Sequence, residues 1–154
     1  MKTHNTQTRS FHFRRPIIAA TLLAAVLSAC SDGLDRADAT NSEAVALGER
    51  LYVENCATCH KADLKGEPNW REAKADGTLP APPHDDSGHT WHHDDQLLFR
   101  YTKLGGAGVA PASFKSNMPG FGAKLSDGEI WSVLSYIKSR WSLQAQARQA
   151  TLNK

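Results

Sequence analysis

The chain has 154 residues, of which 40% are hydrophobic and 22% are charged, and its formal net charge is +2 at pH 7. This length suits one domain rather than several. No polybasic run and no pattern of stacking aromatic residues is present, which argues against nucleic-acid binding. No strand pattern and no internal repeat is present either, so the sequence predicts an all-α protein.

Residues 1–29 have the pattern of an export signal. An apolar stretch over 17–29 is too short to span a membrane and has the length of a signal-peptide core. This leader contains four of the 18 basic residues and none of the 16 acidic ones, so the rest of the chain is slightly acidic. The four basic residues of the leader are Lys2, Arg9, Arg14 and Arg15.

The run Leu27-Ser28-Ala29-Cys30 resembles a bacterial lipobox, in which the cysteine is lipidated and becomes the new N-terminus. We therefore expect Cys30 to anchor the protein to the inner or outer membrane of a bacterium, on the periplasmic side. An ordinary leader cleaved after Ala29 would instead leave Cys30 as a free thiol, which is unusual in an exported protein.

Residues 30–41 are small and polar and predict a tether between membrane and domain. A helical pattern begins at Ser42 and delivers Cys56. The apolar side of this helix is formed by Val45, Leu47, Gly48, Leu51 and Tyr52.

The run Cys56-Ala57-Thr58-Cys59-His60 is the attachment signature of a c-type haem. Two thiols on one helical turn can both reach the vinyl groups of one porphyrin edge, and the following imidazole can then ligate the iron. A zinc site would need a second pair of cysteines or histidines, and a thioredoxin-like redox pair would need a βαβ context. Neither is present, so the sequence predicts one covalent haem c.

Residues 61–88 are rich in Gly, Pro and Asp and predict a long irregular segment, and a short helix over 94–103 ends at Gly105-Gly106. Residues 84–95, where the irregular segment leads into this helix, contain four His and four Asp. Three interpretations compete. The stretch binds copper or zinc, or one of its histidines is the second axial haem ligand, or it is structural, with Asp94 and Asp95 favouring the start of the next helix.

Met118 lies in the run Ser116-Asn117-Met118-Pro119-Gly120, where Pro and Gly prevent a helix and make a rigid loop. The chain has two methionines, and the other, Met1, belongs to the leader. Most methionines fill gaps in a core. An isolated one in a Pro/Gly loop suits that role poorly, so Met118 is predicted as the sixth ligand of the iron.

The last predicted helix begins with a capping box, Ser126 and Glu129, ahead of Ile130. Its apolar residues repeat at helical spacing and form one continuous face. That face consists of Ile130, Val133, Leu134, Ile137 and Trp141. Residues 142–154 are rich in Gln and Ala and are expected to fray as a flexible tail.

With its haem motif, Met-Pro loop and C-terminal amphipathic helix, the chain resembles the class I cytochromes c over residues 42–141. The resemblance implies three or four helices wrapped with loops around one haem, with thioether links at Cys56 and Cys59. It also implies His60 and Met118 as axial ligands, and a crossing of the first and last helices where Gly48 and Tyr52 lie near Val133 and Tyr136.

The resemblance further implies a proline carbonyl that holds the ring N–H of the axial histidine. Pro82 is the preferred candidate, ahead of Pro68, Pro80 and Pro83. Class I chains often use a tryptophan to donate its N–H to a buried haem propionate. Trp91 is the candidate for that role, with His89 as a second donor.

Together these observations predict an electron carrier that moves single electrons between redox partner proteins of a respiratory or periplasmic chain. In this interpretation no residue is catalytic and the protein is not an enzyme. Two alternatives remain. The first is an enzyme whose haem acts on peroxide or a small gas, which requires Met118 to be off the iron. The second is a copper-handling module that uses the histidines of residues 84–95.

Overall fold

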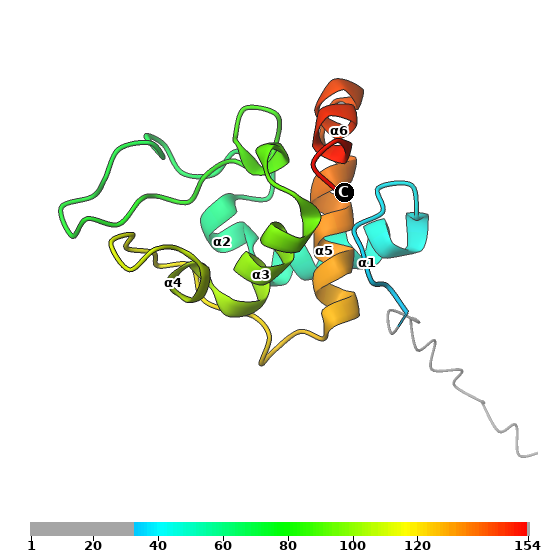
Figure 1. The fold of residues 1–154 in the computed structure, drawn as a ribbon, viewed down its shortest axis with the longest axis horizontal. Coiled ribbons are helices and arrows are strands. Elements are labelled where there is room, and N and C mark those ends of the chain that lie inside the picture. Colours follow the sequence, from blue (N-terminus) through cyan, green and yellow to red (C-terminus); the bar gives the residue numbers. More distant parts are fainter. Residues whose placement is uncertain (1–32, 154) are drawn as a thin grey trace, which may run out of the picture.

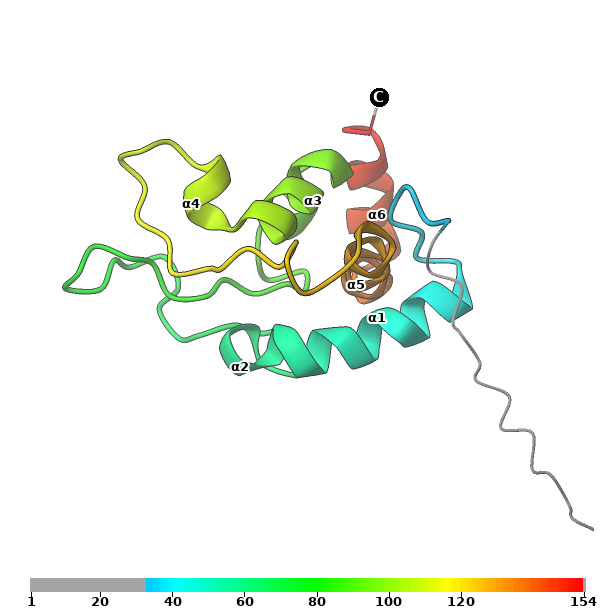
Figure 2. The same cartoon turned by 90° about the horizontal axis from the view of Figure 1, so that it is seen from below.

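The computed structural model describes residues 33–153, so the predicted leader and Cys30 lie outside the described residues. Within this range every regular element is a helix, as the sequence predicts. Figures 1 and 2 show these helices with long loops between them. In chain order the helices are α1 (Ser42–Asn55), α2 (Ala57–His60), the 3₁₀ helix η1 (Thr90–His92), α3 (Asp95–Leu104), α4 (Gly106–Val109), α5 (Asp127–Ser139) and α6 (Leu143–Ala150).

Helix α1 crosses α5 at Gly48, where the two backbones approach closely (Figure 2). A Cβ atom at position 48 would overlap the Ser132 carbonyl and lie 3.0 Å from Cβ of Tyr136. The ring of Tyr52, one turn further along α1, packs 5.4 Å from the ring of Tyr136. The crossing implied by the sequence is therefore confirmed, and it holds the end of α1 that leads into Cys56.

Helix α5 is the centre of the hydrophobic core. Its capping box is present, because the Ser126 side chain accepts from the Glu129 N–H and the Glu129 carboxylate accepts from the Ser126 N–H. Its predicted apolar face is buried against α1, α3 and the loops. The most completely buried hydrophobic side chains of the core are Tyr52, Ile130 and Val133.

The loop over residues 61–89 lacks regular structure but has defined internal contacts. Glu67 and Ala81 bond to each other twice, through Glu67 N–H to Ala81 O at 2.9 Å and Ala81 N–H to the Glu67 carboxylate at 2.7 Å. This hydrogen bond from Ala81 lowers the pKa of the Glu67 carboxyl. The pair closes the base of the loop.

The prediction of a flexible tail over residues 142–154 is wrong for residues 143–150, because they form α6. Ser142 caps the helix by accepting from the Ala145 N–H, and the Ser142 N–H donates to the Asp86 carboxylate at 3.0 Å. Gln149 is fully buried and donates to Asp95 at 2.6 Å and to the His93 carbonyl at 3.1 Å. A long-range polar network therefore holds this helix against the domain, which its composition alone does not predict.

That network centres on Asp95, at the start of α3. Its carboxylate also accepts from the Lys138 ammonium at 3.1 Å and from the Asn153 side chain at 2.9 Å. A buried carboxylate is costly unless it is paired and hydrogen-bonded, and these partners offset the cost of burying Asp95. The network joins α3, α5 and α6.

The predicted tether is also shorter than expected, because its last residues pack on the domain. Ala37 is buried, and the Asp38 N–H donates to the Ser135 hydroxyl of α5 at 2.9 Å. Asn41 then caps α1 by accepting from the Ala44 N–H. No helix among residues 33–153 is long and apolar enough to cross a membrane.

Replacing Gly48 by alanine should destabilise the fold, because the new methyl group must push α1 away from the Ser132 carbonyl. We expect the free energy of unfolding to fall by about 1–3 kcal/mol, the usual range for overpacking. Urea unfolding of the holoprotein measures this. The control is Gly33→Ala, since a Cβ atom there meets nothing within 4 Å. Equal effects of the two changes would contradict the close crossing.

Replacing Gln149 by alanine should loosen α6, because the Asp95 carboxylate and the His93 carbonyl each lose a buried donor. The expected loss is about 1–3 kcal/mol in the free energy of unfolding. The matched control is Gln144→Ala, which removes an exposed glutamine from the same helix. Hydrogen exchange of α6 amides would show whether the helix opens, and unchanged exchange would contradict the docking role of Gln149.

Candidate haem-binding site

Cys56 and Cys59 lie on one helical turn at the junction of α1 and α2. The Cys59 and His60 amides both donate to the Cys56 carbonyl, at 3.2 and 2.9 Å. Cys56 is partly buried and Cys59 is exposed. Burial, together with the neighbouring Cys59, raises the pKa of the Cys56 thiol to about 11, so the site favours uncharged sulfur. This geometry suits two thioether bonds to one porphyrin edge.

His60 is buried, and its Nδ1 atom lies 2.8 Å from the Pro82 carbonyl oxygen. Because a carbonyl oxygen only accepts, Nδ1 carries the proton and Nε2 keeps a free lone pair. Burial lowers the pKa of His60, although the Pro82 bond opposes this. The side chain is therefore a neutral imidazole with one nitrogen available to a metal, which is the form that ligates iron.

The backbone around His60 is held from α1. The Tyr52 hydroxyl donates to the Lys61 carbonyl at 3.2 Å, and it lies 3.5 Å from the His60 carbonyl. The His60 carbonyl also accepts from the Gly66 N–H at 2.9 Å. Tyr52 is fully buried in the α1–α5 crossing, so the crossing fixes the position of the histidine.

Gly66 is required for Pro82 to come so close to His60. Its φ is +66°, a conformation that favours glycine, and a Cβ atom there would lie 2.5 Å from the Ala81 carbonyl and 2.6 Å from the Pro82 carbonyl carbon. The Glu67–Ala81 pair lies directly beside this contact. Sequence reasoning missed Gly66, and its only signal was a glycine six residues after the motif histidine.

Met118 lies on the loop between α4 and α5, on a different part of the fold from His60. Its carbonyl accepts from the Gly106 N–H at 3.1 Å, and its own N–H donates to the Ser116 hydroxyl at 3.2 Å. Gly105 has a φ of +78°, and a Cβ atom there would lie 2.8 Å from the Met118 carbonyl oxygen. The α3–α4 junction therefore fixes the backbone of Met118. Its side chain is only partly buried.

The contacts of the Trp91 side chain do not include His60. Its Nε1–H donates to the Asp86 carbonyl at 3.3 Å, and its ring packs against His92 and under the Arg148 guanidinium of α6. The indole N–H therefore has a backbone partner in this structure. His89, the other suggested donor, stacks on Trp70 at 5.2 Å.

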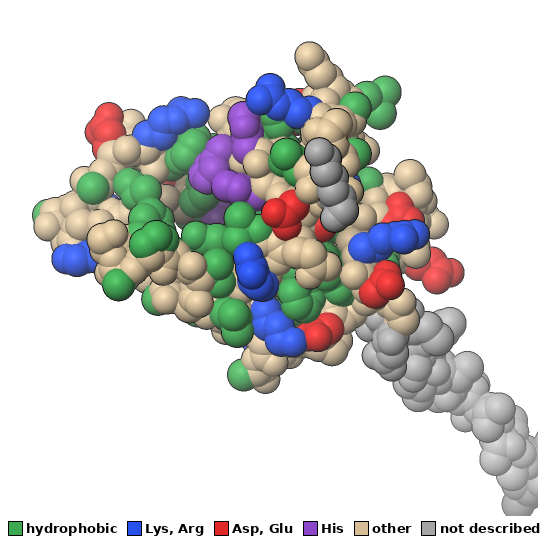
Figure 3. Space-filling view, viewed as in Figure 1, with side chains coloured by type: hydrophobic (Ala, Val, Ile, Leu, Met, Phe, Trp, Pro, Cys, Tyr) green, Lys and Arg blue, Asp and Glu red, His purple; other side chains and the backbone are tan. Residues whose placement is uncertain are grey.

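Histidine side chains gather in one area of the face shown in Figure 3, and within residues 84–95 the rings of His89 and His93 lie 5.4 Å apart. Within residues 33–153, however, no group of three or more His, Cys, Asp or Glu side chains could hold a metal ion. Asp94 instead caps α3, since its side chain accepts from the Leu97 N–H at 2.8 Å. The Asp94 cap therefore supports the structural interpretation of residues 84–95.

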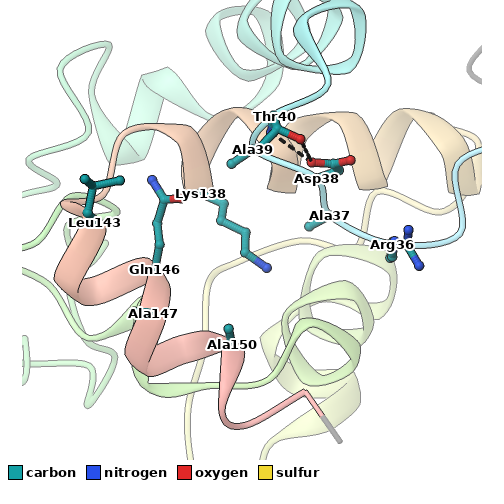
Figure 4. Close-up of a pocket in the computed structure, with 10 residues that line it drawn as sticks. All are labelled: Arg36, Ala37, Asp38, Ala39, Thr40, Lys138, Leu143, Gln146, Ala147 and Ala150. Carbon is teal, nitrogen blue, oxygen red and sulfur yellow. Dashed lines mark hydrogen bonds between the residues drawn. The ribbon is translucent and has the colours of Figure 1, made fainter.

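A separate shallow groove of about 500 Å³ runs between residues 36–40 and helix α6 (Figure 4). Arg36, Lys138 and Leu143 line it, and Asp38 bonds to Thr40 at its edge. None of its lining residues belongs to the Cys56–His60 segment. The groove is therefore distinct from the haem-binding site.

The helical fold and the paired cysteines beside a neutral, buried histidine define a c-type haem domain. The family model for cytochrome c matches residues 45–141. The chain therefore belongs to the cytochrome c family, which binds covalent haem c with its iron, and this membership supports haem-based electron transfer.

Two curated proteins are similar to this chain. It is 35% identical over 101 residues to the thiosulfate dehydrogenase of Stutzerimonas stutzeri (strain A1501), a match that covers 62% of this chain and 27% of that protein. It is 29% identical over 102 residues to the gluconate 2-dehydrogenase cytochrome c subunit of Pantoea cypripedii, covering 65% of this chain and 21% of that protein. The matched region spans about a quarter of these relatives. No solved structure matches.

Replacing Gly66 by alanine should move the Pro82 carbonyl away from His60, because the new Cβ atom would overlap the Ala81–Pro82 backbone. We expect a loss of about 1–3 kcal/mol in unfolding free energy, together with a shift of the His60 Nδ1–H proton resonance and of the reduction potential. NMR and redox titration of the holoprotein measure these.

The matched control is Gly77→Ala. Gly77 also has a positive φ, of +81°, but a Cβ atom there meets only the flexible Lys115 side chain, at 3.3 Å. This variant should lose stability without moving the His60 resonance or the potential. If the two variants behaved alike, Gly66 would have no special role in placing Pro82.

Proposed function

We propose that the protein is a one-electron carrier whose haem iron is ligated by His60 on one side and Met118 on the other. When bound, the haem supplies a one-electron couple between Fe(III) and Fe(II). The observation that carries this proposal is the environment of His60, whose ring is buried and whose Nδ1–H is committed to Pro82 at 2.8 Å. Only Nε2 is left for the iron.

The protein's own residues would hold, orient and insulate this group. Cys56 and Cys59 would form the two thioether bonds, which fix the porphyrin edge to the turn between α1 and α2. Pro82 would set the orientation of the axial ring. In this role the chain performs no chemical step, so we propose that it is not itself an enzyme.

Two observations support Met118 as the second ligand. Its backbone is held by Gly106 and Ser116, so the loop has a defined position. Its side chain is only partly buried and is not one of the buried hydrophobic residues of the core, so it does not serve as core filling. A Met/His pair closes both faces of the iron, which suits electron transfer rather than ligand activation.

We further propose that the partners are redox proteins of a respiratory or periplasmic electron-transfer chain. The names of the two relatives, a thiosulfate dehydrogenase and a cytochrome c subunit of a gluconate dehydrogenase, favour a dehydrogenase as the electron donor. Anchoring to the periplasmic side of a bacterial membrane through a lipid on Cys30 belongs to the same proposal, on the strength of the lipobox-like sequence.

Replacing Met118 by alanine should open the sixth position of the iron. We expect the weak red charge-transfer band of methionine–iron ligation to vanish from the oxidised spectrum, and the reduction potential to fall. The matched control is Asn117→Ala, which removes a loop contact to Thr78 (3.2 Å) but leaves the thioether. A parent protein without the band would contradict Met118 ligation. A histidine in the sixth position would then keep the electron carrier, whereas water or an open position would favour a haem enzyme.

A further inference from the structure

His84 stacks face to face on the proposed axial histidine. The centroids of the His60 and His84 rings are 3.9 Å apart, and the ring planes differ by 19°. We propose that His84 is a positioning residue, whose flat ring fixes the rotational orientation of the His60 imidazole and thereby tunes the haem iron. This inference rests on the proposed ligation by His60.

His84 is itself held on three sides. Its backbone N–H donates to the Leu64 carbonyl at 2.7 Å, and its backbone carbonyl accepts from the indole N–H of Trp141 at 2.8 Å. The edge of its ring packs against Tyr52, with centroids 5.8 Å apart and planes at 65°. The backbone of His84 is therefore fixed at both its N–H and its carbonyl, and Tyr52 limits the movement of its ring against His60.

The His84 and Pro82 contacts restrain His60 in different ways. The Pro82 hydrogen bond fixes one edge of the ring, but hydrogen bonds tolerate tilts of about 30° with little loss. A stacked ring 3.9 Å away leaves much less freedom, because rotation of His60 out of its plane would drive its atoms into His84. The orientation of an axial ligand is one means by which a protein tunes a metal centre.

Simple space-filling does not account for a histidine at this position. The Nδ1 atom of His84 is buried without a hydrogen-bond partner among residues 33–153. Leaving such an atom unpaired lowers the stability of the fold, a loss that leucine or phenylalanine would avoid. A flat ring stacked on His60 is what this position provides.

The test compares His84→Leu, which removes the flat face, with His84→Phe, which keeps it and removes both nitrogens. The readouts on the oxidised holoprotein are the electron paramagnetic resonance g values and the spread of the haem methyl NMR shifts, which respond to axial-ring orientation, and the reduction potential. We expect His84→Leu to change all three and His84→Phe to stay close to the parent. His92→Leu, at an exposed histidine that packs on Trp91, is the control and should change none.

A His84→Leu protein with parental g values and methyl shifts would overturn the inference, as would a His84→Phe protein altered as much as His84→Leu. If His84→Leu fails to fold, His84→Phe alone decides, since parental spectra support the stacking role and altered spectra overturn it. Failure of the proposed function is distinguishable, because it would already appear in the parent as an absorption spectrum without histidine–methionine ligation.

Discussion

The close crossing of α1 and α5 at Gly48 is the constraint on which the rest of this structure depends. Because position 48 has no side chain, the α1 backbone reaches the Ser132 carbonyl, and Tyr52 is carried into the core one turn later. From there the Tyr52 hydroxyl reaches the Lys61 carbonyl, directly after the motif histidine. A packing requirement between two helices therefore becomes a positional requirement on the haem-binding turn.

His60 then illustrates how burial and one backbone carbonyl select one state of an imidazole. Burial favours the neutral form, and the Pro82 carbonyl selects the tautomer with its proton on Nδ1. Gly66 allows the Pro82 backbone to approach. Each of these effects is local, but they depend on a loop that is closed by contacts between residues 14 apart, Glu67 and Ala81.

The sequence predicted the parts of this fold that depend on local chemistry. The haem motif, the capping box at Ser126 and the cap at Asp94 are short patterns whose physical meaning does not depend on the rest of the chain. The all-α class followed from helical periodicity, and the family match over residues 45–141 agrees with it.

The parts that the sequence could not predict depend on distant partners. Helix α6 is held in place by Gln149 bonding to Asp95, a residue 54 positions away, and without that partner the Gln/Ala-rich segment was predicted to fray as a tail. Ala37 and Asp38 looked like linker residues until Ser135 supplied a partner 97 positions from Asp38. His84 was one of several histidines in a polar stretch, and only the folded loop brings it onto His60.

The two proposed axial ligands are held by restraints of unequal strength, and this difference bears on function. His60 is restrained by a helix, a hydrogen bond to its ring, the Tyr52 hydroxyl and a stacked ring. Met118 is restrained through its backbone at Gly106 and Ser116, on a loop whose neighbouring residues are mostly exposed. Under the proposed ligation, the methionine side therefore has fewer restraints than the histidine side. Whether the protein is an electron carrier or a haem enzyme would then depend on how firmly the α3–α4 junction holds this loop, more than on the haem motif itself.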